Sequence, residues 1–262
     1  MTRLFLPPEI LRSERIIITG NQARYLSVVL RVKPGERITL FDGQGFRYEC
    51  GIIQSHKKEV VAERISKEPY SVESPVSIIL AQGLPKADKM DLIVEKATEL
   101  GVRSIIPLIT EYSQVRHTEK VERWRKIALS ASQQSGRNRI PDILDPIGFL
   151  EYLTRISAPL KEDEGAPTLS GIIFSEEKEG INCKEILSGL RGIKNMIVLI
   201  GPEGGFSKKE ISSAVRYGFT EVSLGPRILR TETAPIAALS IIQYEIGDMG
   251  NMQSPPPDPL ND

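Results

Sequence analysis

The sequence is poor in cysteine and histidine. Its 262 residues include only two cysteines, Cys50 and Cys183, which lie far apart and outside any C-x-x-C motif. We therefore expect neither a disulfide framework nor a zinc site, and this cysteine usage fits a reducing cytoplasm. The two histidines, His56 and His117, stand among charged residues, so solvated positions are expected. The chain thus has few histidines that could act in acid–base catalysis, and no metal is expected.

Long apolar runs are also missing. None approaches the ~20 residues that a helix needs to cross a bilayer. Residues 1–9 carry a positive charge but no sustained apolar stretch, so they do not resemble a signal peptide. These observations favour a cytoplasmic protein that does not associate with a membrane.

There is no excess of charge of either sign, which taken alone argues against a nucleic-acid-binding protein. The distribution is uneven, however. The net charge is +4 in residues 1–72, +4 in residues 86–139 and −7 in residues 140–262. Two interpretations stay open: a chance asymmetry of the surface, or a basic face in the first half that contacts phosphates.

Residues 1–72 have the pattern of a small β-rich domain. Short apolar or alternating segments, separated by glycine turns, predict several strands that form a small barrel. Asn21 is placed to cap a helix that runs to Leu30. Polar residues 66–74 are expected to be a linker. The predicted strands are residues 4–6, 15–18, 36–41, 46–53 and 58–65.

After residue 75 the pattern changes to alternating strands and helices. Apolar strand runs separated by helices of 3.6-residue period predict a parallel α/β sheet covered on both faces. We assign residues 1–72 to the barrel, 73–249 to the α/β domain and 250–262 to a disordered tail. Strands are expected at residues 76–81, 105–109, 171–174, 196–200 and 219–224. Helices are expected at 88–100, capped by Asp88, at 119–134, at 207–217, capped by Ser207 with Glu210, and at 233–246.

A glycine-rich loop at residues 201–205 joins an apolar strand to the helix capped by Ser207. Loops at the carboxyl ends of parallel strands bind ligands, and glycines let a ligand approach the backbone closely. A tight turn without a ligand is the plainer interpretation, but Glu203, flanked by glycine, has no core to pack against. The loop matches neither the P-loop nor the dinucleotide-binding motif.

A second loop, residues 224–234, also follows a strand and precedes a helix. It carries Arg227, Arg230 and Glu232 between two apolar segments. Thr233 could simply cap the helix, and Pro235 in its first turn costs no hydrogen bond. Capping does not account for the dense mixture of charges.

Four motifs in this order resemble those of the RsmE family: Lys96–Val102, Gln133–Arg137, Gly201–Phe206 and Leu224–Ala234. The resemblance spans most of the chain, while residues 145–195 and those after 248 match only loosely. It implies a SPOUT-type parallel sheet with a C-terminal trefoil knot and an N-terminal PUA-like barrel. It also implies methylation by S-adenosylmethionine at N3 of a specific uridine in 16S rRNA, action on the small ribosomal subunit, and a homodimer.

The resemblance carries roles onto particular residues. Arg230 is the first candidate to stabilise negative charge on the uracil. Glu203 could accept the N3 proton, and Arg137 could hold a phosphate or the base. The expected phosphate contacts are Arg3, Arg31, Lys33, Lys86 and Lys89. The expected cofactor contacts are Leu199, Ile200, Gly201, Pro202, Glu203, Gly204, Gly205, Leu224, Gly225, Ile228, Leu229, Arg230, Thr233 and Ala234.

Two other functions stay open. The chain could be a non-catalytic RNA-binding protein on a methyltransferase scaffold. It could also be a nucleotide-phosphate enzyme that uses the glycine loop as an anion site, although the lysine of a P-loop is missing.

Overall fold

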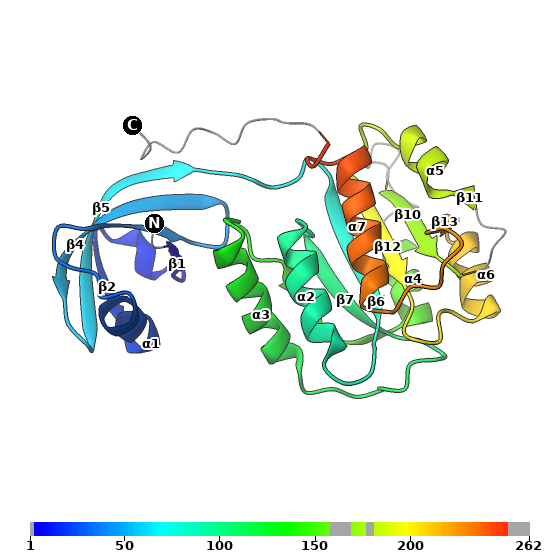
Figure 1. The fold of residues 1–262 in the computed structure, drawn as a ribbon, viewed down its shortest axis with the longest axis horizontal. Coiled ribbons are helices and arrows are strands. Elements are labelled where there is room, and N and C mark those ends of the chain that lie inside the picture. The colour runs from blue at the N-terminus through cyan, green and yellow to red at the C-terminus, as the bar shows by residue number, and fades with distance from the viewer. Residues whose placement is uncertain (1–2, 158–168, 177–180, 251–262) are drawn as a thin grey trace. The chain divides into compact units, whose positions relative to one another are not determined.

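The computed structural model describes residues 3–157, 169–176 and 181–250. Within these ranges the chain forms two compact units (Figure 1). The N-terminal unit contains residues 3–73 and 132–140, and the second unit contains residues 74–131 and 141–250. Residues 132–140 thus group with the N-terminal unit, although the sequence pattern places them in the second. No helix in the described ranges has the length and apolar character needed to cross a membrane.

The N-terminal unit is built on a five-stranded sheet in the order β1-β3-β4-β5-β2. β1 pairs with β3 in parallel, and the other pairs are antiparallel. Leu6, Ile16, Leu26 and Ile38 are among its fully buried core side chains. The elements are β1 (Arg3–Phe5), η1 (Ile10–Arg12), β2 (Arg15–Thr19), α1 (Gly20–Arg24), η2 (Tyr25–Val29), β3 (Arg37–Phe41), β4 (Phe46–Ser55) and β5 (Glu59–Pro69).

The sheet of this unit is curled, but hydrogen bonds between its edge strands do not close it into a barrel. β1 and β2 are its edges, and the described strands include no pairing between them. Register shifts at Glu49/Cys50 and Ile52/Gln54 interrupt the β4–β5 ladder, and such bulges bend a strand and increase its twist. The barrel expected from the sequence is therefore a curled sheet.

Two local predictions in this unit were wrong. The expected helix from Asn21 to Leu30 is a short α1 followed by a π-helical turn, and Asn21 does not cap it, because the helix already begins at Gly20. The expected linker at residues 66–74 is strand as far as Pro69, because β5 continues to pair with β4 there.

The second unit contains an all-parallel sheet in the order β11-β13-β10-β12-β6-β7-β8, and β9 also pairs with β7. Its strands are β6 (Ser77–Gly83), β7 (Ser104–Ile109), β8 (Asp142–Ile143), β9 (Ile147–Gly148), β10 (Leu169–Phe174), β11 (Ile181–Asn182), β12 (Asn195–Ile200) and β13 (Phe219–Ser223). Its helices are α2 (Lys89–Glu99), α3 (Val121–Gln134), α4 (Phe149–Ser157), α5 (Cys183–Gly189), α6 (Lys208–Arg216) and α7 (Thr233–Glu245).

Helices cover both faces of this sheet, as predicted. Ile197 and Leu199 of β12 share a buried cluster with Phe149 and Leu153 of α4 and Ala214 of α6. Successive strand residues point to opposite faces, so the residue between Ile197 and Leu199 faces the other layer. That layer holds α7, which packs on α2 and α5 and crosses in front of β6 and β12 in Figure 1.

The parallel α/β arrangement expected for this unit is confirmed, with local exceptions. Gly101, at φ +83°, ends α2 as expected. Asp88 does not cap α2, because its carboxylate binds Lys120 Nζ at 2.9 Å instead. α4, α5 and the two-residue strands were not predicted. The expected tail lies outside the described residues, apart from residue 250.

α6 begins with the predicted capping box. Ser207 Oγ accepts the Glu210 backbone N–H at 3.3 Å, and Glu210 Oε2 accepts the Ser207 N–H at 2.9 Å. Two of the donors that every helix leaves unpaired at its N-terminus are thereby satisfied. The capping box fixes where the loop at residues 201–205 ends.

We expect Ser207→Ala to lower the free energy of unfolding by about 1 kcal/mol, because a buried N–H loses its acceptor. Ser212→Ala is the matched control, since Ser212 is exposed in the same helix. It should change the free energy by no more than about 0.5 kcal/mol. Urea denaturation measures both, and equal destabilisation by the two variants would contradict the capping role.

Candidate functional site

The glycine loop folds tightly back on itself after β12. Gly205 adopts a φ of +66°, a left-handed conformation that side chains with a Cβ rarely take. A Cβ on Gly201 would lie 2.7 Å from the carbonyl carbon of Gly205, closer than real contacts allow. Both ends of the loop therefore require glycine.

The loop also lies directly against the end of β6. A Cβ on Gly83 would stand 2.6 Å from the backbone nitrogen of Pro202. β6 and β12 are neighbouring parallel strands, so their carboxyl ends meet at one edge of the sheet. The absence of a side chain at Gly83 lets Pro202 pack against the strand end.

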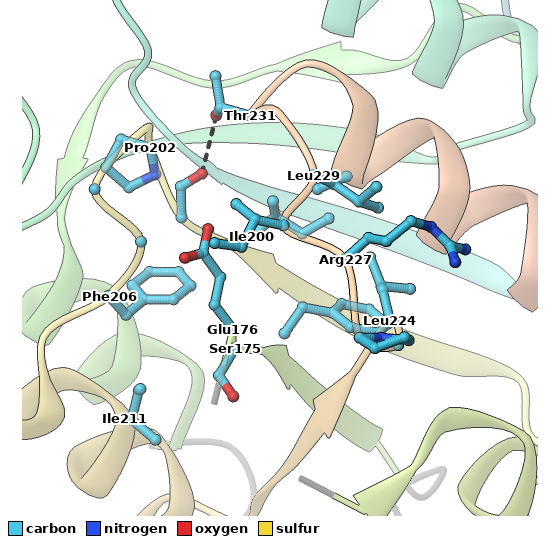
Figure 2. Close-up of a pocket in the computed structure, with 18 residues that line it drawn as sticks. Ser175, Glu176, Ile200, Pro202, Phe206, Ile211, Leu224, Arg227, Leu229 and Thr231 are labelled. Atoms are coloured by element: carbon cyan, nitrogen blue, oxygen red, sulfur yellow. Dashed lines mark hydrogen bonds between the residues drawn. The ribbon is translucent and has the colours of Figure 1, made fainter. Parts of the chain in front are cut away.

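Gln82 joins three segments beneath this loop. Its side chain is completely buried, and its Nε2 donates to the carbonyl oxygens of Gly83 at 3.0 Å and Gly201 at 3.1 Å. Thr231 Oγ1 donates to the same Gly201 oxygen at 3.1 Å, the contact drawn in Figure 2. The two sequence motifs and the end of β6 are thus held together at one carbonyl.

A cavity of about 300 Å³ opens between the two loops (Figure 2). It lies beyond the carboxyl ends of β10, β12 and β13, which is where parallel α/β sheets bind ligands. Side chains of apolar character dominate its wall. The lining residues are Phe174, Ser175, Glu176, Ile200, Gly201, Pro202, Gly204, Gly205, Phe206, Ile211, Leu224, Gly225, Pro226, Arg227, Ile228, Leu229, Thr231 and Ala234.

Most of the residues predicted to bind the cofactor line this cavity, and four do not. The four are Leu199, Glu203, Arg230 and Thr233. Sequence reasoning missed the contribution of β10, which brings Phe174, Ser175 and Glu176 to the cavity. The apolar run of β10 was the available signal, because the end of a strand in the same parallel sheet reaches the same edge.

Glu203 points to α2 and is not among the cavity-lining residues. Its Oε1 accepts from Lys89 Nζ at 2.9 Å and from the Lys86 backbone N–H at 3.1 Å. Lys89 Nζ also lies 3.4 Å from Glu232 Oε2. Lys89 therefore connects the glycine loop to the start of α7.

These contacts change the acidity of Glu203. Partial burial by itself would raise its pKa, but the hydrogen bonds from Lys89 and from backbone N–H groups outweigh that effect and lower the pKa. The hydrogen bond with Glu203 in turn raises the pKa of Lys89. A carboxylate with a lowered pKa is a weak proton acceptor, so the geometry does not favour Glu203 as a general base.

The two arginines predicted to be catalytic have different surroundings. Arg230 is exposed, and its guanidinium has no hydrogen bond or ion pair with any described residue. Arg137 belongs to the N-terminal unit, where its side chain is only 4% exposed and donates to Glu73 Oε1 at 3.2 Å. Arg137 does not line the cavity.

The five residues predicted to contact phosphates also divide. Arg31, Lys33 and Lys86 have exposed side chains. Arg3 donates to the carbonyl oxygen of Arg137 at 2.6 Å and stacks over the Phe41 ring, and its pKa is lowered to about 10 by burial. Lys89 is bound to the two glutamates described above. Among the described residues, no group of three histidine, cysteine, aspartate or glutamate side chains could hold a metal.

Comparison with known proteins gives a consistent result. A family model described as an RNA methyltransferase domain matches residues 72–243, and one described as an RNA methyltransferase PUA domain matches residues 18–63. Ribosomal RNA small subunit methyltransferase E of Bacillus subtilis is 34% identical over 87% of this chain and 89% of its own length.

Two solved structures are similar along almost the whole chain. Ribosomal RNA small subunit methyltransferase E of Neisseria gonorrhoeae, bound to S-adenosylmethionine, is 36% identical, with a TM-score of 0.83 over 95% of this chain and 99% of that one. A Legionella pneumophila protein with the same cofactor bound is 33% identical, with a TM-score of 0.81 over 95% of this chain and 100% of that one.

The domain match first defines the class, an RNA methyltransferase with a PUA domain. At this identity and coverage, the chain belongs to the family of ribosomal RNA small subunit methyltransferase E. The predicted family, the SPOUT-type α/β fold and the PUA-like N-terminal unit are thereby confirmed. The trefoil knot stays a prediction.

The ion pair of Glu203 yields a prediction about pH. A carboxylate whose pKa is lower in the folded state stabilises the fold above its unfolded pKa of about 4.3, and this contribution disappears as the pH falls through the folded pKa. Wild type should therefore be more stable than Glu203→Gln at pH 7. The difference in the free energy of unfolding should disappear at acidic pH.

Urea denaturation from pH 7 to pH 3 measures this difference. Lys89→Met provides the matched background, in which replacing Glu203 should have a smaller and less pH-dependent effect. A difference between wild type and Glu203→Gln that stays constant over the whole range would contradict the assignment.

Proposed function

We propose that this chain transfers a methyl group from S-adenosylmethionine to N3 of a uridine in small-subunit ribosomal RNA. One observation carries the proposal. The two loops that resemble the family motifs enclose a single cavity at the ends of three parallel strands, in a chain 36% identical to a relative with that cofactor bound. The uridine and its N3 atom come from the motif resemblance.

The cavity suits an adenosyl compound. Its volume of about 300 Å³ is at the lower end for ligand pockets, and apolar side chains such as Ile200, Phe206 and Leu224 could flank an adenine. Ser175 Oγ is buried without a hydrogen-bond partner among the described residues, so a polar ligand atom would satisfy it. When bound, the cofactor supplies an electrophilic methyl group on a sulfonium.

We assign cofactor binding to the cavity-lining members of the two loops, through their backbone groups and apolar side chains. Three of the four predicted residues outside the lining have supporting roles in this proposal. Leu199 is a fully buried core residue, and Thr233 begins α7. Glu203 holds the glycine loop to α2 through Lys89.

We assign Arg230 the role of stabilising the uracil base while it reacts. The segment on either side of it lines the cavity, and its guanidinium is unpaired among the described residues. As N3 forms its bond to the methyl carbon, the carbon–sulfur bond breaks and the N3 proton leaves. A guanidinium beside a carbonyl oxygen of the uracil would stabilise the negative charge that develops.

Other groups from the sequence prediction receive different roles. We propose that Arg137, held by Glu73, fixes residues 132–140 within the N-terminal unit and does not touch the base. Exposed Arg31, Lys33 and Lys86 remain the proposed phosphate contacts. An rRNA substrate also supports a cytoplasmic location.

We further propose a homodimer that uses α7. This helix buries Ala238, Leu239 and Ile242 inside its own unit, yet Ile241 and Tyr244 remain 37% and 64% exposed. A helix that is apolar all round is usually covered on all sides. A second copy of the same helix would cover the exposed side.

Replacement of Arg230 tests the assigned chemistry. We expect Arg230→Ala to lower kcat by about 10²–10³-fold, because a single charge-stabilising donor is lost. Binding of S-adenosylhomocysteine and the unfolding midpoint should not change. Arg191→Ala, at another exposed arginine, is the control. Methyl transfer to small-subunit RNA measures both, and wild-type turnover by Arg230→Ala would refute the role.

Replacement of Tyr244 tests the dimer. A charge at the centre of an apolar interface is costly, so Tyr244→Asp should shift the protein from dimer to monomer in sedimentation equilibrium. Tyr217→Asp is the matched control, because Tyr217 is 39% exposed at the end of α6, and α6 packs on the face of the sheet opposite to α7. A monomeric wild type, or an unchanged mass for Tyr244→Asp, would contradict the proposal.

A further inference from the structure

Glu176 stands at the point where β10 enters the cavity. The last backbone hydrogen bond between β10 and β13 runs from the Ser175 N–H to the Val222 carbonyl oxygen at 3.1 Å. Glu176 is the next residue, so its backbone position follows from the ladder. In Figure 2 its carboxylate rises from the strand end toward Ile200 and Phe206.

This carboxylate has no protein partner within the described residues. No hydrogen bond or ion pair involves it, whereas Glu203 and Glu232 nearby are both bound to Lys89. Among the described residues, it is also the only carboxylate that lines the cavity. Glu176 is exposed, and a carboxylate that no described protein group binds is suited to accept hydrogen bonds from a ligand.

We propose that Glu176 binds the ribose of the cofactor, accepting hydrogen bonds from its 2′- and 3′-hydroxyls. This inference rests on the proposed function, because it takes the cavity to be the S-adenosylmethionine site. The two oxygens of one carboxylate match two adjacent hydroxyl donors. Acidic side chains beyond strand ends bind ribose hydroxyls in dinucleotide-binding folds for the same reason.

The amino-acid end of the cofactor is a poorer match for Glu176. Its ammonium and carboxylate groups share one carbon, so a site for them needs an acidic and a basic side chain close together. Arg227 is the only basic residue among the described residues of the lining, and Figure 2 shows its guanidinium directed away from Glu176. Two neutral hydroxyls need no such neighbour.

The test compares three ligands by calorimetry on the full-length chain. S-adenosylhomocysteine has the complete framework, 5′-methylthioadenosine lacks the amino-acid group, and 2′-deoxy-5′-methylthioadenosine also lacks one hydroxyl. We expect Glu176→Gln to weaken binding of the first two ligands by about tenfold or more, because a charged acceptor is lost. Glu185→Gln, an exposed glutamate on α5, is the control and should bind like wild type.

The third ligand locates the contact. Removing the 2′-hydroxyl should weaken binding to wild type but have little further effect in Glu176→Gln, because the same hydrogen bond is already lost. If Glu176→Gln weakens binding of S-adenosylhomocysteine alone, the proposal is overturned, and Glu176 instead binds the ammonium group of the cofactor's amino-acid end. Unchanged binding of all three ligands would overturn it as well. Failure of wild type to bind any of them would instead refute the proposed function together with this inference.

Discussion

The geometry of the site depends on one buried amide, that of Gln82. It is the only side-chain amide of β6, and it donates to two backbone carbonyls while its Oε1 has no partner among the described residues. A buried unpaired acceptor costs about 1–3 kcal/mol, so the position is not chosen for stability alone. With Thr231 and the close approach of Gly83 to Pro202, it holds both motif loops at one strand end. The cavity exists because those loops cannot separate there.

Much of the fold follows from patterns that are local in the sequence. Apolar strand runs and helices of 3.6-residue period predicted the parallel sheet, and the Ser207–Glu210 spacing predicted where α6 begins. The wrong predictions concern features of local structure that tertiary contacts determine. Asp88 binds Lys120 from another segment instead of capping its own helix. Curling of the N-terminal sheet depends on bulges in β4, which no local spacing reveals.

The site could be predicted as two loops but not as an arrangement of charges. Glycine content and position after a strand located residues 201–205 and 224–234, and the family resemblance named the ligand. Sequence could not show that Lys89 lies between Glu203 and Glu232. The ion pairs among these three residues hold the glycine loop near the start of α7. Nor could it show that Glu176 lies at the cavity without a partner among the described residues, since its surroundings come from strands far along the chain.

Transfer of labelled methyl groups shows directly whether this protein methylates N3 of a uridine in small-subunit RNA. Small ribosomal subunits from a strain that lacks this gene would be incubated with the purified protein and labelled S-adenosylmethionine, and the RNA digested to nucleosides. We expect label in 3-methyluridine at one position. Gly83→Ala, which pushes Pro202 away from the strand end, should label far less. Absence of label with the wild-type protein, or label on a different base or atom, would contradict the proposed activity.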